Sequence, residues 1–212
     1  VVRAPLVLAT SRYSRKRIAE AYGIPPEKIR VVPELIDVEA WEAGLDRAQH
    51  EAGRRPVILS VAHMYPRKRI DTLLTAFRTV ATHHGEAELR IVGWGQEYRR
   101  LVRLAESLGL SQRVRFLGHV SQDALFHHYK NCEIFCLPSV QEGFGIVFLE
   151  AMVAGKPIVA ANAAAVPEVV RHGINGLLVA PNASSELAEA LLTLLENRDL
   201  REHYGRVGRE GV

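Results

Sequence analysis

Short apolar runs alternate along most of the chain with longer stretches in which apolar residues recur every three or four positions. The runs predict six strands, at 56–62, 88–93, 113–118, 133–139, 156–161 and 175–180. The longer stretches between and after them predict amphipathic helices. Strands that alternate with helices in this way indicate an α/β fold with a doubly wound, Rossmann-like, six-stranded parallel sheet.

The start of the chain does not continue this pattern. A strand in PLVLAT, a helix in SRYSRKRIAEAYG and a turn and strand in PPEKIRVVP predict a short β-α-β unit. A polar helix and linker follow. We therefore expect a short unit at 1–38, a linker helix at 39–55, one complete domain at 56–200 and a C-terminal tail at 201–212.

Composition indicates a globular chain that does not cross a membrane. Hydrophobic residues make up 48% and charged residues 24% of the 212 residues, and no apolar run reaches the roughly 20 residues of a membrane-spanning helix. Cys132 and Cys136 fall in NCEIFCLPS, where we expect them to pack in the core of a protein from a reducing compartment. A metal site is not expected, because the chain shows no suitable spacing of ligands.

The formal net charge of +3 is small, but basic residues cluster at two places, Ser11–Arg17 and Pro66–Arg69. The first cluster reads as a solvated helix face, with an anionic membrane surface as the next interpretation. Nucleic acid is not an expected partner, because no aromatic residues or known motif accompany the arginines. The sequence begins with Val and shows no signal-peptide pattern, so we expect a fragment of a cytoplasmic protein, with peripheral contact to the cytoplasmic face of a membrane as an extension of this expectation.

The stretch EGFGIVFLEAMVAGKPIVA carries the main candidate chemistry, two acids separated by a glycine pair and an apolar helix. Parallel sheets bind ligands outside the carboxyl ends of their strands, and this stretch follows the fourth strand. Gly143 and Gly145 let the backbone approach a ligand, and the free N–H groups of the helix start favour a phosphate. Glu142 and Glu150 could then accept hydrogen bonds from ligand hydroxyls such as a ribose diol. The alternative is a tight turn with a glutamate that pairs with a basic neighbour.

Lys68 lies in the loop after the first strand of the main domain, where it could bind a diphosphate as a point charge; the alternative is an exposed helix start. GWGQEY resembles the beginning of a dinucleotide fingerprint, but it lacks the third glycine and follows the second strand, which argues against a nicotinamide cofactor. No G-x-S-x-G elbow is present, so serine-hydrolase chemistry is not expected.

Five motifs in order resemble the donor-binding, C-terminal half of a retaining group 1 glycosyltransferase with the GT-B architecture. They are VAHMYPRKRIDTLLTAF, LRIVGWGQE, VRFLGHVSQDAL, EIFCLPSVQEGFGIVFLEAMVAGKPIVA and NGLLV. The resemblance covers about 56–200, while residues 1–40 resemble the last strand, helix and crossover of the acceptor-binding domain. It implies transfer of a sugar from a nucleotide-diphosphate sugar to a sugar or lipid-linked acceptor, without a cofactor or a metal.

The resemblance also assigns roles to residues. It implies that Glu142 contacts the donor sugar, Glu150 the ribose and Lys68 the diphosphate. Backbone groups complete the expected donor site: the N–H groups of Gly143, Phe144 and Gly145 for sugar and phosphate oxygens, and the loops at Gly93 and at His119 and Val120 for the base.

Two departures from the family pattern bear on function. The family usually has Gly-Arg where this chain has Ala62-His63, and histidine is shorter and not reliably charged near neutral pH. His63, Lys68 and Glu142 are therefore the expected catalytic residues, with weaker stabilisation of the leaving diphosphate. The crossover Pro33-Glu34-Leu35 replaces the common Pro-Asn-Gly. A non-catalytic nucleotide-sugar binding module remains the alternative function.

Overall fold

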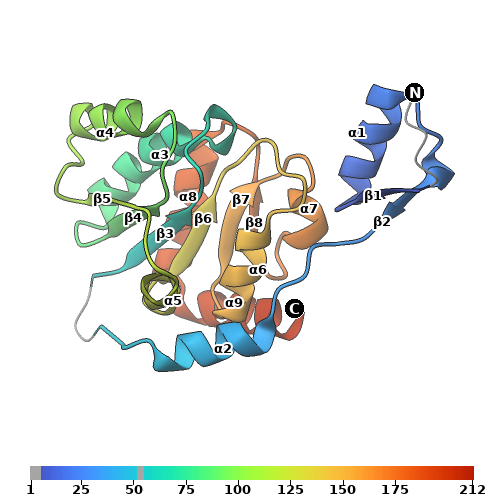
Figure 1. The fold of residues 1–212 in the computed structure, drawn as a ribbon. Helices are drawn as coiled ribbons and strands as arrows, with labels where there is room; N and C mark the ends of the chain where they lie inside the picture. The colour runs from blue at the N-terminus through green and yellow to red at the C-terminus, as the bar shows by residue number, and fades with distance from the viewer. Residues whose placement is uncertain (1–5, 52–54) are drawn as a thin grey trace.

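The computed structural model describes residues 6–51 and 55–212, and its main element is a six-stranded parallel sheet (Figure 1). The strands lie in the order β5-β4-β3-β6-β7-β8. Their bounds are β3 Val57–Val61, β4 Glu88–Val92, β5 Val114–Gly118, β6 Ile134–Leu137, β7 Ile158–Ala161 and β8 Gly176–Val179. All six predicted strands and the predicted α/β class are confirmed.

Helices cover both faces of this sheet, as Figure 1 shows. One face carries α3, α4 and α8, and the other carries α2, α5, α6 and α9. Their bounds are α2 Val38–Arg47, α3 Ile70–His83, α4 Tyr98–Ser107, α5 Gln122–Lys130, α6 Ile146–Val153, α7 Val166–Val169, α8 Ser184–Glu196 and α9 Arg198–Glu210. The central strands are buried between these layers, which explains why most of their residues are apolar. Ser60 on β3 and Glu88 and Arg90 on β4 are the buried polar exceptions.

The strand order reverses between β3 and β6. From β3 the chain adds β4 and β5 on one side, then returns to place β6, β7 and β8 on the other. The loops after β3 and β6 therefore leave the sheet in opposite directions and open a crevice at its carboxyl edge.

Helix starts follow the sequence signals at some positions and not at others. Ser121 precedes the helical stretch QDALFHHYKN in the sequence, a position that predicts a cap, and it does cap α5: its hydroxyl accepts a hydrogen bond from the Ala124 N–H at 3.3 Å. The stretch DTLLTAFRTVATHH predicts a helix capped by Asp71, which would start at Thr72, but α3 begins two residues earlier, at Ile70. Arg69 precedes it with a left-handed φ of 52°, at the end of a 3-10 turn. The 3-10 turn therefore leads directly into α3, which has no side-chain cap.

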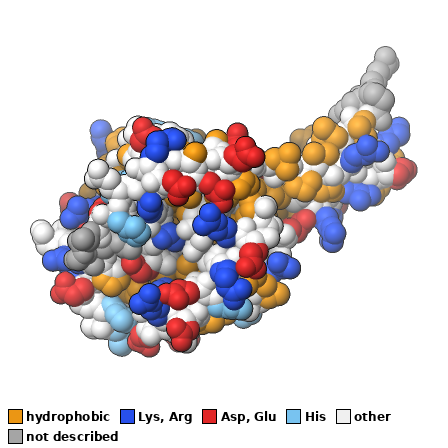
Figure 2. Space-filling model, turned by 90° about the horizontal axis from the view of Figure 1, so that it is seen from below, with side chains coloured by type: hydrophobic (Ala, Val, Ile, Leu, Met, Phe, Trp, Pro, Cys, Tyr) orange, Lys and Arg blue, Asp and Glu red, His pale blue; other side chains and the backbone are white. Residues whose placement is uncertain are grey.

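The N-terminal residues form the predicted β-α-β unit, which projects from the main domain (Figure 1). Two parallel strands, β1 Val7–Ala9 and β2 Ile29–Val31, flank α1 Arg12–Tyr22, which is capped by Ser11. Hydrophobic side chains gather along this projecting arm in Figure 2, and the large exposed ones include Leu8, Val32 and Leu35.

Two expected boundaries change in the structure. The linker helix at 39–55 is helical only up to Arg47, and residues 52–54 of that range lie outside the described residues. Its Trp41 packs edge-on against Phe126 and Tyr129, with ring centroids 5.0 and 5.4 Å apart, so α2 belongs to the core.

The expected tail at 201–212 is instead most of α9, a helix with a buried face. Tyr204 is buried, and Gly205 lies so close to the backbone that an added Cβ would stand 2.1 Å from the Gly155 carbonyl oxygen. The main domain therefore extends to the end of α9. Within the described residues, no helix is long and apolar enough to span a bilayer.

Candidate functional site

A cavity of about 490 Å³ opens at the carboxyl edge of the sheet, where the strand order reverses. It is lined from the loops after β3, β4, β5 and β6, by the first turn of α6 and by α5. The lining residues are Glu34, Val61, Ala62, His63, Arg67, Lys68, Val92, Gly93, His119, Val120, Leu125, Glu142, Gly143, Phe144, Gly145, Ile146 and Val147. All the site residues predicted from the sequence are among them, except Glu150.

An ion pair between Lys68 and Glu142 lies at one end of this cavity. Lys68 Nζ donates to Glu142 Oε1 at 2.6 Å, and the two side chains are only 12% and 7% exposed. Arg67 stands near the same carboxylate, with its Nη1 3.9 Å from Oε2, and donates to the Gln141 carbonyl at 2.9 Å. The loops after β3 and β6 are thus joined by charge, and the ammonium of Lys68 is held beside the cavity.

The glycine loop turns directly into α6. Gly145 has a left-handed φ of 98°, and a Cβ there would lie 2.7 Å from Cδ2 of the Phe148 ring. Only glycine fits this position without displacing the buried ring. The turn brings the backbone of Gly143, Phe144 and Gly145 to the cavity wall at the N-terminus of α6, an arrangement that favours anions.

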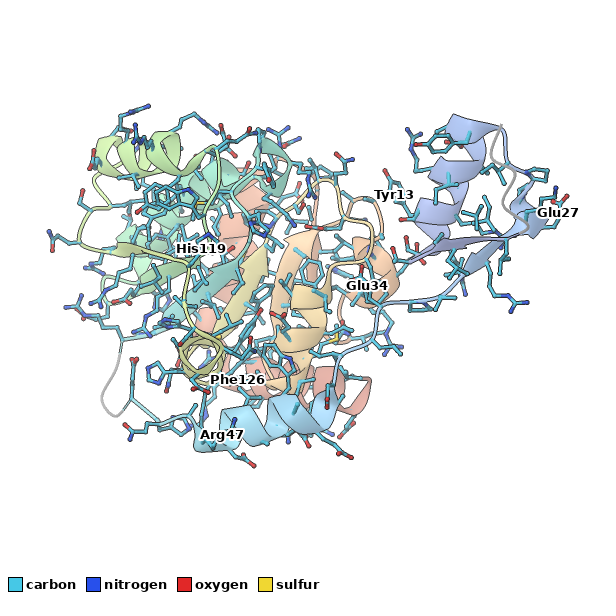
Figure 3. The ribbon with its side chains drawn as sticks, viewed as in Figure 1. Tyr13, Glu27, Glu34, Arg47, His119 and Phe126 are labelled. Atoms are coloured by element: carbon cyan, nitrogen blue, oxygen red, sulfur yellow. The ribbon has the colours of Figure 1, made fainter. Side chains whose placement is uncertain are left out.

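Backbone also forms the opposite wall, at the ends of β4 and β5. Gly93 and Gly118 are joined by a β-bridge, and Gly93 has a φ of 120°. A Cβ on Gly93 would stand 2.0 Å from the Ala62 carbonyl oxygen, so no side chain can enter here. His119 follows this bridge, and its ring lies 6.4 Å from that of His63. Figure 3 shows His119 on the loop after β5.

Glu150 lies farther along α6 and does not line the cavity. Its Oε2 accepts a hydrogen bond from the Tyr129 hydroxyl at 2.7 Å, between α6 and α5. Burial raises the pKa of Glu150 above 4.5, and the Tyr129 hydrogen bond opposes that rise. The expected contact with a ribose is not tested by this arrangement and stays a prediction.

Two charged residues of the cavity are absent from the sequence-based prediction of the site. Glu34 reaches it from the segment that joins the N-terminal unit to α2, where Figure 3 labels it. Arg67 precedes the predicted Lys68 in the same basic cluster. The basic cluster in the sequence could have indicated Arg67. No sequence pattern indicates Glu34, which lines the cavity because the segment that carries it passes beside it.

The cavity combines cations, a helix N-terminus and backbone amides on one side with carboxylates beside them. Such a set can bind a diphosphate and accept hydrogen bonds from hydroxyls. No group of three or more His, Cys, Asp or Glu side chains suited to a metal ion occurs in the part of the chain that the structure describes.

Similar proteins show to which family this chain belongs. The family model described as glycosyl transferases group 1 matches residues 44–211. A GDP-mannose-dependent alpha-(1-6)-phosphatidylinositol monomannoside mannosyltransferase of Mycobacterium tuberculosis is 35% identical, over 98% of this chain and 57% of that protein. A D-inositol 3-phosphate glycosyltransferase of Corynebacterium jeikeium is 34% identical, over 97% of this chain and 52% of that protein.

A solved structure agrees with these relatives. The crystal structure of Anabaena Alr3699/HepE in complex with UDP and glucose superposes with a TM-score of 0.84 at 28% identity, over 98% of this chain and 58% of that one. The chain thus spans only a little more than half the length of each of these proteins. With a family model that covers most of its length and a cavity where the motifs predict one, the chain belongs to the group 1 glycosyl transferases.

Proposed function

We propose that this chain forms the donor-binding part of a retaining glycosyltransferase, which binds a nucleotide-diphosphate sugar for transfer of the sugar to an acceptor. The observation that carries the proposal is the convergence of Lys68, the glycine loop before α6 and the backbone of Gly93 on one cavity. The relatives support it, since one is named for GDP-mannose and another was crystallised with UDP.

In the proposed reaction, the bond between the anomeric carbon and the leaving phosphate oxygen breaks, and negative charge develops on the diphosphate. The acceptor oxygen forms the new bond to the anomeric carbon, and its proton passes to the departing diphosphate. Lys68 and the amides at the start of α6 line the cavity and would stabilise that negative charge, and His63 would add to them. Glu142, which orients Lys68, would accept hydrogen bonds from the donor sugar with its remaining lone pairs. No metal or cofactor is assigned to this step.

A calorimetric titration with UDP, GDP and ADP and their sugars tests the proposal. We expect one nucleotide class to bind and Lys68→Met to lower its affinity at least about tenfold, because a charge-assisted contact to the diphosphate is lost. Lys16→Met is the matched control, since it removes an ammonium whose side chain is 77% exposed on α1. The proposal would be contradicted if none of these nucleotides bound, or if Lys68→Met bound the nucleotide as tightly as the wild-type chain does.

The ribose contact of Glu150 needs a separate test. Glu150→Ala should weaken binding of the nucleoside diphosphate and leave that of inorganic diphosphate unchanged, because only the former carries ribose hydroxyls. Equal weakening of both ligands would show that the substitution acts through the fold of α6.

A non-catalytic binding module is the second candidate, favoured by His63 at the position of the family arginine. We expect this chain alone to transfer little or no sugar, so the comparison belongs in the longer protein. There, His63→Arg should raise turnover if weak stabilisation of the leaving group limits it. Turnover with His63 equal to that of related enzymes would exclude the module.

The acceptor and the location complete the proposal. The relatives are considerably longer than this chain, and one is named for a phosphatidylinositol mannoside acceptor. We therefore assign recognition of a sugar or lipid-linked acceptor to a part of the protein outside these 212 residues. Separately, we propose a cytoplasmic location, in keeping with the expectation that Cys132 and Cys136 belong to a protein from a reducing compartment. Exposed cations on α1, such as Arg12 and Lys16, would support peripheral contact with an anionic membrane face.

A further inference from the structure

Two hydroxyl groups of the N-terminal unit reach across to the glycine loop of the main domain. Thr10 Oγ1 and Ser14 Oγ each donate a hydrogen bond to the Gly143 carbonyl oxygen, both at 3.1 Å. These residues are more than a hundred positions apart in sequence, and the carbonyl belongs to the loop that lines the cavity. The two bonds use both lone pairs of that oxygen.

A second set of contacts holds the hydroxyls in place. The carboxylate of Glu168, on α7, accepts hydrogen bonds from the first two N–H groups of α1, Arg12 N at 2.9 Å and Tyr13 N at 2.8 Å. Figure 3 shows Tyr13 on α1, on the side toward the main domain. Because Glu168 fixes the start of α1 against the main domain, the hydroxyls on either side of that start are fixed as well.

Ser11, the residue that caps α1, strengthens the same contact. Its hydroxyl donates to Ser14 Oγ at 3.0 Å, and Ser14 Oγ donates onward to the Gly143 carbonyl. Successive hydrogen bonds polarise one another, so the final bond is stronger than an isolated one.

The orientation of this carbonyl decides where the next amide points. A peptide unit is planar and trans, and no cis peptide occurs within the described ranges, so the Phe144 N–H points opposite to the Gly143 carbonyl. That carbonyl points at α1, and Phe144 lines the cavity. Among the described residues, the Phe144 N–H has no backbone hydrogen-bond partner. Since glycine permits the peptide to rotate at little cost, external bonds are needed to hold it.

We propose that Thr10 and Ser14 are positioning residues of the donor site, which hold the Gly143–Phe144 peptide so that the Phe144 N–H faces the cavity and donates to a phosphate or sugar oxygen of the donor. The inference rests on the proposed function of the cavity and adds that the N-terminal unit helps to form the anion site. Its role is to fix an amide rather than to touch the ligand.

The test compares a double variant, Thr10→Val with Ser14→Ala, with a hydroxyl-retaining one, Thr10→Ser with Ser14→Thr. Thr75→Val is the matched control, because it removes a threonine hydroxyl that bonds the Asp71 carbonyl at 3.0 Å on α3. The first measurement, without ligand, is the ¹⁵N–¹H resonance of the Phe144 amide. It should shift in the double variant and stay in place in the other two.

The second measurement is the affinity for whichever of UDP, GDP and ADP the wild-type chain binds most tightly. We expect about a tenfold loss in the double variant, with wild-type affinity in the hydroxyl-retaining variant, because one hydrogen bond to a charged phosphate is misplaced. Nucleotide addition should move the Phe144 amide resonance downfield in the wild type and much less in the double variant.

The outcomes separate the two proposals. Wild-type affinity in the double variant, or an unmoved Phe144 resonance without ligand, would overturn the positioning role while leaving the donor site in place. A wild-type chain that binds none of UDP, GDP and ADP would overturn the proposed function, and the role of these hydroxyls in donor binding with it.

Discussion

Removal of the Tyr129 hydroxyl should destabilise the chain in a pH-dependent way. The ring of Tyr129 is fully buried between Trp41 and Phe135, and its hydroxyl donates to Glu150 Oε2 at 2.7 Å. Tyr129→Phe keeps the ring and deletes one hydrogen bond, so packing changes little. A hydrogen bond to an ionised carboxylate is worth about 1.5–3 kcal/mol, and one to a neutral partner about 0.5–1.5 kcal/mol.

The direction of the pH dependence follows from the pKa of Glu150. Burial raises this pKa above 4.5 in the folded chain, so ionisation of Glu150 at higher pH costs folding free energy. The Tyr129 hydroxyl lowers this cost, and without it the pKa rises further. The extra loss is therefore present above the folded pKa and disappears as the pH falls below 4.5. We expect Tyr129→Phe to lower the free energy of unfolding by about 2 kcal/mol at pH 7 and about 1 kcal/mol near pH 4.

Urea unfolding at the two pH values, followed by tryptophan fluorescence, measures this difference. Trp41 is a suitable reporter, because its ring lies 5.4 Å from that of Tyr129. Tyr204→Phe is the control: this tyrosine is also buried, and its hydroxyl makes no side-chain hydrogen bond in the part of the chain that the structure describes. A loss that is the same at both pH values, or no larger than that of the control, would refute the assignment of an ionised Glu150 to this bond.

Four further variants test the cavity wall and the polar groups around Arg90 on β4. Gly93→Ala should lower the free energy of unfolding by more than about 2 kcal/mol and abolish the proposed nucleotide binding, because the new Cβ overlaps the Ala62 carbonyl at a φ of 120°. Gly118→Ala has open space around its Cβ and should lower the free energy of unfolding, measured in urea, by only about 1 kcal/mol. Burial lowers the pKa of His128 to about 4, so stability should fall as the pH drops from 6.5 to 4, and His128→Leu should flatten that fall in thermal unfolding. The hydrogen bond from Arg90 lowers the pKa of Glu51 to about 2, so the stability that Glu51 contributes is present above pH 4.5 and lost toward pH 2. Glu51→Gln should therefore be less stable than wild type at pH 6 and equally stable near pH 2. For either residue, the same dependence of stability on pH in wild type and variant would contradict the assignment.

The sequence is sufficient to predict the sheet and most of the cavity lining, for physical reasons. Strands such as β3 and β6 are buried on both faces and are therefore mostly apolar, so they can be recognised in the sequence. The cavity lies where parallel strands end, and the residues after those strands, including Lys68 and Gly93, can be read directly from strand positions.

Other features depend on contacts that no local pattern encodes. The bond between Tyr129 and Glu150 joins two helices, and either residue alone is compatible with many partners. In α9, Gly205 and Gly208 resemble helix breakers in sequence, yet they allow the helix to pack closely against the backbone at Gly155 and the side chain of Met152. The sequence predicts a tail there because the close packing that these glycines allow can be recognised only in the folded domain.

The sheet has a consequence for handling the protein. The cavity occupies the carboxyl edge, whereas the turn at Asn197 between α8 and α9 is exposed and absent from the cavity lining. A fluorophore or affinity handle attached at that turn would leave the ligand crevice untouched. Immobilised through this site, the molecule would present its open crevice to solution for screening of sugar nucleotides.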